Sequence, residues 1–362
     1  MIKVRCLTDG LSSWNSWGFL APLIRFKEDL KSSGIDLKFV NKIEDLSPNG
    51  ITLLDSKFMK RFYKKQATDI DLIFAEISGK SGRVIFSDNS DSSGIFLTEP
   101  FEFCDLFIKG VILQDLNQYQ KQYYGGRFYS DINHKKFGIA DSQPLYSPKL
   151  SRKNLKKIRL GWNPGFLRYS RHSVYLQRLL RSCNVGLVPK VVIEPNIEAF
   201  QRPIVRTTTI HARFFKEYQR QSVAYLRKNM ADQLKIRGIN TEKLGRRDYW
   251  NELRHSRLVF SPFGLGEITL KDFEAFSVGS ALAKPDMSNI QTWPNFYIPF
   301  ETYIPHRLDL SDLDEILHSV HSDPSRYDKI AKQAQMHYES IVSSRQGSSN
   351  FVSHFRKIIE AV

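Results

Sequence analysis

The chain has only three cysteines among its 362 residues, and it lacks any apolar run long enough to cross a bilayer. Cys6, Cys104 and Cys183 stand far apart in apolar surroundings, which favours buried free thiols over a disulfide framework or a metal site. A membrane-spanning helix needs about 20 consecutive apolar residues, and the N-terminal segment lacks the features of a signal peptide. We therefore expect a cytoplasmic protein without a membrane anchor.

The sequence also lacks the short motifs of several large enzyme classes. It has no GxGxxG, no P-loop and no HExxH segment, which weakens dehydrogenase, nucleoside triphosphatase and metalloprotease interpretations. Disorder is excluded as well, because 41% of the residues are hydrophobic and 12% are aromatic. At this length, a folded protein with two domains is the expectation.

Acidic residues are missing from one long stretch. No Asp or Glu occurs between Asp141 and Glu194, where eleven Lys and Arg residues lie. In residues 142–257, here called the basic band, Lys and Arg outnumber Asp and Glu, and this excess accounts for the net charge of +15. Part of the band could neutralise a nucleotide diphosphate in a cleft, and part could contact an anionic membrane surface. Nucleic-acid binding is disfavoured because no RNA or DNA module is recognisable.

Short apolar segments alternate with helical patterns along the chain, which is typical of parallel α/β sheets. The first unit covers residues 1–150, and it ends in a Ser-, Pro- and Lys-containing stretch that has the composition of a linker. A second unit covers residues 151–340; its alternation begins near residue 158 and includes strand candidates at 189–193 and 204–211. Residues 341–362 form an amphipathic helix that needs an apolar surface to pack against. Two α/β units in sequence predict a cleft between them.

Three polar loops in the first unit, at 9–18, 87–94 and 123–134, follow apolar segments. Ligands collect outside the carboxyl ends of parallel strands, so these loops supply site candidates, which are Asn15, Gly18, Asp88, Asp91, Arg127 and His134. Other interpretations stay open, because Asp88 and Asp91 suit ordinary turns and Asn15 and Gly18 suit a helix start. His134 also fits an ordinary loop histidine.

The segment with the most chemical content is SPFGLGE at 261–267, followed by a helical segment that ends at Gly279. Gly264 and Gly266 let backbone approach a ligand, and free amides at the helix N-terminus attract a diphosphate. Glu267 and Glu274 lie two helical turns apart and share one face. One carboxylate can therefore sit near a sugar or phosphate, and the other near a ribose.

The run SPFGLGEITLKDFEAFSVGSALAKPD, with NIQTWPNFY after it, resembles the donor-binding segment of GT-B nucleotide-sugar glycosyltransferases, in particular group 1 and exostosin-like enzymes. Glu274, Ala275 and Gly279 match the family pattern, in which the matching glutamate holds the nucleotide ribose. The group 1 pattern places its first glutamate at the position of Gly266, and the nearest acid here is Glu267. The segments FSDNSDSSG and YYGGRFYSDINHKKFGI are similar to parts of bacterial glycosyltransferase-like proteins.

The resemblance implies two Rossmann-like domains facing a cleft, with the last helix crossing back to the first domain. It implies transfer of a sugar from a nucleotide-sugar to a glycan or lipid-linked acceptor in bacterial surface polysaccharide or lipopolysaccharide assembly, without metal or another cofactor. Peripheral contact with the inner face of the cytoplasmic membrane is compatible with it. The alternative is a non-catalytic two-lobed protein that binds nucleic acid or an anionic membrane through the basic band.

The resemblance also assigns roles to the candidate residues. The catalytic candidates are Asp88, Asp91, His134 and Glu267. The donor-binding candidates are Glu274, Gly264, Gly266, Arg206, His211, Arg213 and Lys216, of which the basic ones would neutralise the departing diphosphate. The acceptor-side candidates are Asn15, Gly18 and Arg127.

Overall fold

A six-stranded parallel sheet forms the first lobe of the computed structural model, which describes residues 1–63, 69–170, 172–181, 183–194 and 206–362. Its strand order is β2-β1-β3-β4-β5-β7. The strands are β1 (Ile2–Leu7), β2 (Ile35–Val40), β3 (Ile51–Asp55), β4 (Arg83–Asp88), β5 (Leu106–Lys109) and β7 (Ile158–Leu160). Central residues such as Leu53, Ile85 and Phe107 are fully buried, because helices cover both faces of a parallel sheet.

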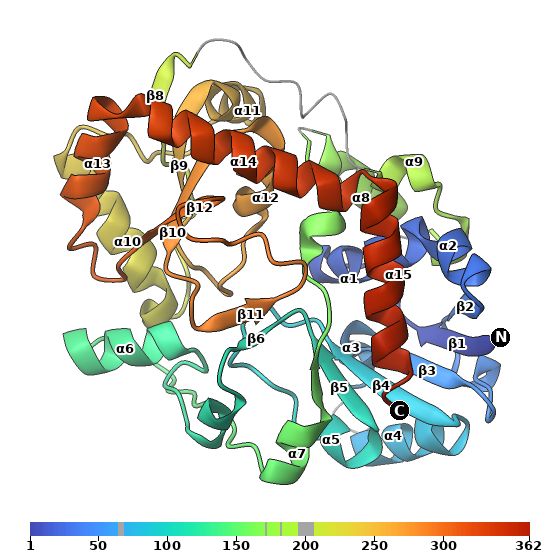
Figure 1. The fold of residues 1–362 in the computed structure, drawn as a ribbon. Coiled ribbons are helices and arrows are strands. Elements are labelled where there is room, and N and C mark those ends of the chain that lie inside the picture. Colours follow the sequence, from blue (N-terminus) through green and yellow to red (C-terminus); the bar gives the residue numbers. More distant parts are fainter. Residues whose placement is uncertain (64–68, 171, 182, 195–205) are drawn as a thin grey trace.

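Helices α1 and α2 lie on one side of this sheet, and α4 and α5 lie on the other (Figure 1). Ser13 starts α1 as its N-cap, and its side chain accepts a hydrogen bond from the Ser16 amide. The helices of this lobe are α1 (Trp14–Arg25), α2 (Lys27–Ser32), α3 (Ser56–Tyr63), α4 (Ile70–Gly79), α5 (Pro100–Phe103), α6 (Phe128–Phe137), α7 (Arg152–Lys157), α8 (Ser173–Leu180) and α9 (Lys190–Ile193). Short 3-10 helices are η1 (Ile43–Asp45), η2 (Leu116–Gln120), η3 (Pro164–Phe166) and η4 (Val185–Leu187).

A four-stranded parallel sheet forms the second lobe, with strand order β12-β10-β9-β8. Its strands are β8 (Thr208–His211), β9 (Ser256–Phe260), β10 (Ala281–Pro285) and β12 (Tyr303–His306). Its helices are α10 (Gln221–Ile236), α11 (Arg246–His255), α12 (Leu270–Val278), α13 (Leu313–Ser322) and α14 (Pro324–Val342). Thr269 and Asp272 form a capping box that starts α12, and Gly279 ends it in the left-handed region at φ 68°.

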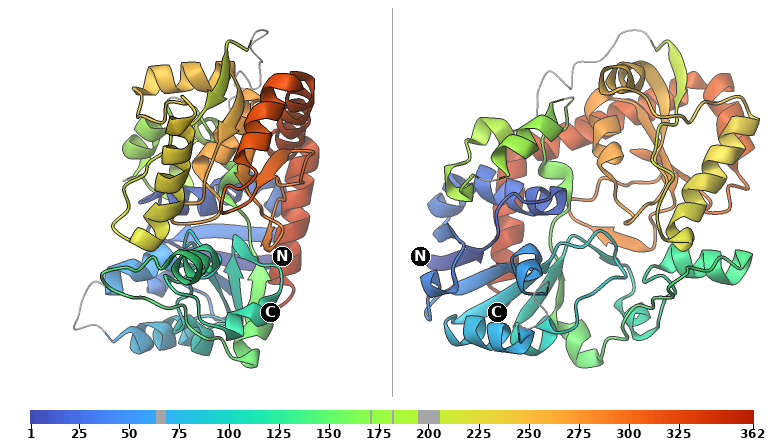
Figure 2. Two further views of the ribbon diagram at one scale, coloured as in Figure 1. Left: turned by 90° about the vertical axis from the view of Figure 1, so that its left-hand side faces the viewer. Right: turned by 180° about the vertical axis from the view of Figure 1, so that it is seen from behind.

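A strand pair and the last two helices join the lobes. Strands β6 (Val111–Leu113) and β11 (Ile290–Thr292) pair as an antiparallel ribbon. Helix α14 runs along the second lobe and α15 (Arg345–Ile359) then turns onto the first, so both chain termini lie there (Figures 1 and 2). The Phe351 ring packs 5.3 Å from Phe26 and 5.4 Å from Trp162. The apolar face of the last helix is thereby covered.

This architecture confirms the predicted fold class, in which two α/β lobes face each other and the last helix crosses back. Three details differ. The strand at 158–160 pairs with β5 and belongs to the first sheet, not to the second unit. The strand expected at 189–193 is the short helix α9, and Cys183 is exposed, whereas Cys6 and Cys104 are buried. Of the strand expected at 204–211, residues 204 and 205 lie outside the described residues.

Candidate functional site

A cavity of about 380 Å³ lies between the two lobes, where the carboxyl ends of their strands face each other. The first lobe contributes the start of α1, the loop after β4 and residues 162–164. The second lobe contributes Tyr218, Arg227, the Gly264 to Gly266 loop and residues 268–270. Ligands of α/β proteins bind at this edge of the sheet. The cavity therefore joins the polar loop at 87–94 and the SPFGLGE segment, as the sequence predicted.

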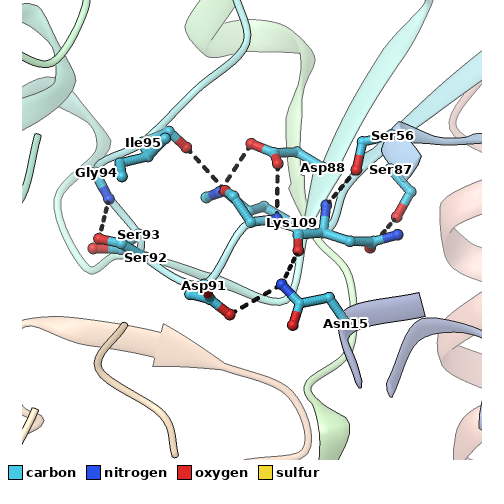
Figure 3. Close-up of polar contacts among 12 residues, drawn as sticks. Asn15, Ser56, Ser87, Asp88, Asp91, Ser92, Ser93, Gly94, Ile95 and Lys109 are labelled. Carbon is cyan, nitrogen blue, oxygen red and sulfur yellow. Dashed lines mark hydrogen bonds and ion pairs between the residues drawn. The ribbon is translucent and has the colours of Figure 1, made fainter. Parts of the chain in front are cut away.

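Asp88 ends β4, and its carboxylate is engaged in the first lobe (Figure 3). Its Oδ2 lies 2.9 Å from Lys109 Nζ, and both side chains are buried. Its Oδ1 accepts a hydrogen bond from the Ser90 amide at 2.9 Å, as in an ordinary turn. Lys109 Nζ also donates to Ser90 Oγ. Because a buried lysine neutralises it, Asp88 is suited to fixing the loop after β4 rather than to removing a proton.

Asp91 is the exposed one of the two carboxylates that line the cavity. Asn15 on α1 donates through Nδ2 to Asp91 Oδ1 at 3.0 Å and to the Asn89 carbonyl at 2.7 Å (Figure 3). Asn15 therefore orients the loop that carries Asp91. This contact makes Asp91 the better placed of the two predicted acids for contact with a substrate.

Three glycines of the site are explained by close packing. A Cβ on Gly266 would lie 1.9 Å from the Asp91 carbonyl oxygen, so the two lobes meet there backbone to backbone. A Cβ on Gly264 would lie 2.7 Å from Arg227 Nη2 and 2.8 Å from the Tyr218 hydroxyl. A Cβ on Gly18 would lie 2.7 Å from the Pro164 side chain. The close approach predicted for Gly266 is thus to the other lobe.

Arg227 is a cavity residue that the sequence interpretation missed. Its side chain projects from the middle of α10 and is buried beneath the glycine loop. Nε, Nη2 and Nη1 donate to the carbonyls of Phe263, Pro262 and Phe215 at 2.7, 3.0 and 3.1 Å. Burial lowers its pKa from the usual value. No carboxylate among the described residues forms an ion pair with it.

A second polar cluster begins one turn beyond the cavity. Glu274 follows the cavity-lining Leu270 by four residues, so both lie on one face of α12. The Tyr249 hydroxyl donates to Glu274 Oε2 at 2.5 Å, and Lys271 Nζ donates to that hydroxyl at 2.7 Å. Burial is the main cause that lowers the pKa of Lys271 to about 8. Tyr249 and Lys271 were not predicted, because nothing local distinguishes them before α11 and α12 are packed together.

His211 and Arg213 belong to the same cluster, but both face Glu252. His211 Nδ1 lies 2.9 Å from Glu252 Oε1, and Arg213 donates to both carboxylate oxygens, at 2.9 and 2.8 Å. Burial lowers the pKa of His211 to about 4, so it is neutral near pH 7. Partial burial would raise the pKa of Glu252, but hydrogen bonds from His211 and Arg213 lower it to about 2. Lys216 likewise pairs with Glu242 at 3.3 Å. The charges of Arg213 and Lys216 are therefore balanced by carboxylates of their own lobe.

Two predicted residues lie away from the cavity. Arg206 precedes β8, so it stands at the amino end of that strand, where it donates to the carbonyls of Gly279 and, at 2.6 Å, Arg254. His134 sits on α6 rather than in a loop. Its ring stacks on Tyr124 at a centroid distance of 3.9 Å, and its Nδ1 lies 2.8 Å from the Ile139 carbonyl oxygen. Neither residue lines the cavity: Arg206 closes the end of α12, and His134 packs within the first lobe.

Arg127 and Glu267 connect the lobes instead of lining the cavity. Arg127 Nε donates to the Leu265 carbonyl at 2.7 Å. Glu267 is fully buried and accepts three hydrogen bonds from Ser92 and Ser93 of the first lobe. Glu267, expected beside a donor sugar, instead contacts the first lobe in this structure.

The basic band does not form one surface. Helix α7 precedes β7 at one edge of the first sheet, whereas η4 contacts β2 at the opposite edge, and the described residues 206–257 lie in the second lobe. Arg171 of the band lies outside the described residues. Arg237 pairs with Asp314 at 2.5 Å, and Arg257 pairs with Asp328 at 3.3 Å. This dispersal does not favour a single binding face for nucleic acid.

The described ranges contain neither a cluster of metal ligands nor a helix that could span a membrane. No group of three or more His, Cys, Asp or Glu side chains in them is arranged to hold a metal ion. None of the helices in them combines the length and the apolar character that a bilayer crossing requires.

Neither a protein-family model nor a curated protein matches the chain. Solved structures that are similar to it include HepE of Anabaena in complex with UDP-glucose, with 12% identity, coverage of 100% of both chains and a TM-score of 0.46. An alpha-glucosyltransferase in complex with UDP and a 13-mer DNA has 8% identity, 99% coverage of both chains and a TM-score of 0.44. A sucrose-phosphate synthase from Thermosynechococcus elongatus has 9% identity, 100% coverage of both chains and a TM-score of 0.42. At such low identity, the architecture stands on the chain's own topology.

Proposed function

We propose that this protein is a glycosyltransferase that moves a sugar from a nucleotide-sugar donor. The observation that carries the proposal is Arg227, a guanidinium buried at the cavity wall beside Gly264 without a carboxylate partner among the described residues. Carbonyl oxygens satisfy its hydrogen bonds but not its charge, and a buried charge without an opposite charge is costly in a protein interior. A bound diphosphate in the cavity would supply the missing negative charge.

The donor lies along the second lobe in this proposal. Its diphosphate occupies the space between Arg227 and the start of α12, where helix amides favour an anion. Its ribose lies one helical turn further, at Glu274. The Tyr249 hydroxyl donates to Glu274 Oε2, whereas no described residue donates to Oε1. Oε1 is therefore available to accept a hydrogen bond from a ribose hydroxyl. A charged acceptor forms stronger hydrogen bonds than a neutral one.

Transfer leaves a nucleoside diphosphate whose charge must be stabilised. In our proposal, Arg227 and the backbone amides at the start of α12 perform this role, and the reaction needs no metal ion. Preorganised donors of this kind stabilise the charge that develops in a transition state. The first lobe presents Asp91 across the cavity, where it contacts the acceptor or the transferred sugar.

We also propose that the acceptor is a glycan or a lipid-linked molecule of bacterial surface polysaccharide assembly, met at the inner face of the cytoplasmic membrane. Exposed side chains of α8 and η4 support this setting. Leu179 and Leu187 are 74% and 80% exposed on α8 and η4, and the neighbouring Arg178, Arg181 and Lys190 are also exposed. Apolar side chains among basic ones suit an anionic bilayer, where each basic residue contributes about 1 kcal/mol. Vesicles with anionic lipid should therefore sediment the protein, Leu179→Glu should weaken this, and equal sedimentation with neutral vesicles would contradict it.

Nucleotide binding tests the central proposal. UDP, GDP, ADP and CMP are added in a thermal-shift screen, and at least one of them should raise the melting temperature. When the nucleotide is at 100 times its Kd, the gain in free energy of unfolding is about 2.7 kcal/mol. This corresponds to roughly 5 to 11 °C in melting temperature for a domain of about 150 to 250 residues. No shift with any nucleotide would refute the proposal.

Two variants tie the activity to the site. Glu274→Ala should abolish turnover of the matching nucleotide-sugar. The protein should stay folded, because Glu274 is partly exposed and its loss opens no core cavity. Arg227→Lys should weaken nucleotide binding, because lysine lacks the planar fork that reaches three carbonyls. The matched control is Glu76→Ala on α4, where the glutamate is exposed and pairs with Lys80. Full activity of Glu274→Ala would exclude Glu274 from the site.

A further inference from the structure

Glu267 occupies an unusual place for a residue that immediately follows the glycine loop. Its side chain is fully buried, and three hydrogen bonds from the first lobe end on its carboxylate. Ser93 Oγ donates to Oε1 at 2.8 Å, Ser92 Oγ donates to Oε1 at 3.3 Å, and the Ser93 amide donates to Oε2 at 3.0 Å. Both oxygens thus accept hydrogen bonds from a segment about 175 residues earlier in the sequence.

The residues before Glu267 are held by the same lobe. The Tyr129 hydroxyl donates to the Gly264 carbonyl at 2.7 Å, and Arg127 Nε donates to the Leu265 carbonyl at 2.7 Å. Gly266 packs directly on the Asp91 backbone, where no Cβ would fit. Each of four successive residues of the second lobe therefore has its own contact with the first.

The segment that binds Glu267 is also anchored from behind. The Tyr119 hydroxyl donates to the Ser93 carbonyl at 3.0 Å and accepts from the Leu113 amide at 2.7 Å. A Cβ on Gly94 would lie 2.5 Å from the Gly126 carbonyl oxygen, so this side is closely packed as well. Residues 91–94 are thus fixed between their own lobe and the carboxylate of the other.

We infer that Glu267 is a positioning residue that joins residues 91–94 of the first lobe to the glycine loop of the second. It thereby sets the place of Asp91 across the cavity from Arg227. Its carboxylate is fully buried and does not line the cavity, so it does not reach a sugar in this arrangement. The effect on transfer rests on the proposed function, whereas the contact between the lobes does not.

Hydrogen exchange measures the contact without any substrate. In Glu267→Gln, one acceptor oxygen becomes an amide that faces hydrogen-bond donors, and a hydrogen bond to a charged group is lost. Amides of residues 90–94 should then exchange about tenfold faster or more, which is the effect expected from such a loss. Glu76→Gln on the exposed face of α4 serves as the matched control and should leave this segment unchanged. Unchanged exchange in Glu267→Gln would refute the inference.

Ser93→Ala keeps the proposal testable if Glu267→Gln does not fold, because it removes one donor and leaves the carboxylate in place. It should speed exchange of residues 90–94 by a smaller factor. In the double variant, exchange should match that of Glu267→Gln alone, because both substitutions break one contact. Independent effects whose factors multiply would contradict a shared contact.

Kinetics separate positioning from donor binding. With the nucleotide-sugar that matches the nucleotide found in the screen, Glu267→Gln should lower kcat about tenfold or more and change the donor KM less than twofold. Glu274→Ala should instead weaken donor binding. If Glu267→Gln raises the donor KM tenfold and leaves exchange unchanged, Glu267 binds the sugar and the inference is wrong. If no nucleotide binds the wild-type protein, the proposed function fails, and the exchange result still decides the contact.

Discussion

A buried ion pair lies beneath the glycine loop and the start of α12, and the effect of breaking it should be measurable. Asp272 and Lys284 are both fully buried, with Oδ2 and Nζ 3.0 Å apart. Ser261 Oγ donates to Asp272 at 2.5 Å, the Tyr297 hydroxyl at 2.8 Å and the Thr269 amide at 3.0 Å. Replacing Lys284 by Met keeps the volume of the side chain but leaves the carboxylate buried without a cation.

Breaking a buried pair from one side costs about 3 to 5 kcal/mol. Thr269 Oγ1 also donates to Asp272, at 2.9 Å. The four remaining hydrogen bonds to Asp272 place Lys284→Met at the lower end, at about 3 kcal/mol of unfolding free energy. This corresponds to roughly 6 to 12 °C in melting temperature. The double variant Asp272→Asn with Lys284→Met removes both charges, so it should recover about half of the loss or more.

Urea unfolding followed by fluorescence measures both variants, and an unchanged m-value shows that the same surface is exposed. A loss below about 1 kcal/mol in Lys284→Met would refute the reasoning, because it would mean that water reaches Asp272. A double variant no more stable than Lys284→Met would also refute it. The same samples, titrated with the nucleotide from the screen, show whether the double variant restores binding.

Three further predictions follow from the site and its surroundings. Burial lowers the pKa of His211 and of His306 from 6.5 to about 4, so between these values the unfolded chain binds protons that the folded chain does not. The contribution of the two neutral imidazoles to the free energy of unfolding should be fully present above about pH 6.5. Below that, it should fall by about 1.4 kcal/mol per pH unit for each imidazole until about pH 4. Urea midpoints that are equal at pH 7 and pH 5 would contradict this. Gly266→Ala should force the lobes apart and reduce the nucleotide-induced thermal shift. Gly79→Ala should not, because an added Cβ there meets no described residue within 4 Å; equal shifts would show that the lobes tolerate the methyl group. Asp91→Asn should lower kcat about 100-fold or more if Asp91 acts as a base, and unchanged turnover would exclude that role.

Much of the fold could be predicted because its signals are local. The strand, glycine loop and helix at 256–278 follow from an apolar run, two glycines and a capping box that lie within a short stretch of chain. The apolar face of residues 351–359 predicted a packed helix, and in the structure this face of α15 packs against Phe26 and Trp162. The strand at 158–160 was assigned to the wrong sheet, because pairing with β5 is a long-range choice that three residues do not specify.

The site residues divide in the same way. Asn15, Asp91 and Gly264 were predicted from loops at strand ends, and they line the cavity. Arg227 was missed, because an arginine in the middle of a helix is normally exposed and only tertiary packing buries it under the glycine loop. Arg206 was misplaced because the position at which β8 begins decides which edge of the sheet the residue reaches.

The sequence by itself determined two α/β units, a glycine loop before a helix that carries Glu274, and the absence of several common enzyme motifs. These depend on residue order and periodicity, which any reader of the chain can see. Only the tertiary structure decided which charges remain unbalanced. Arg213, Lys216 and Asp88 meet opposite charges, Glu267 is used to join the lobes, and Arg227 faces the cavity without a carboxylate partner among the described residues. The physical reason is that electrostatic balance depends on distance and burial, and both arise only when remote segments pack together.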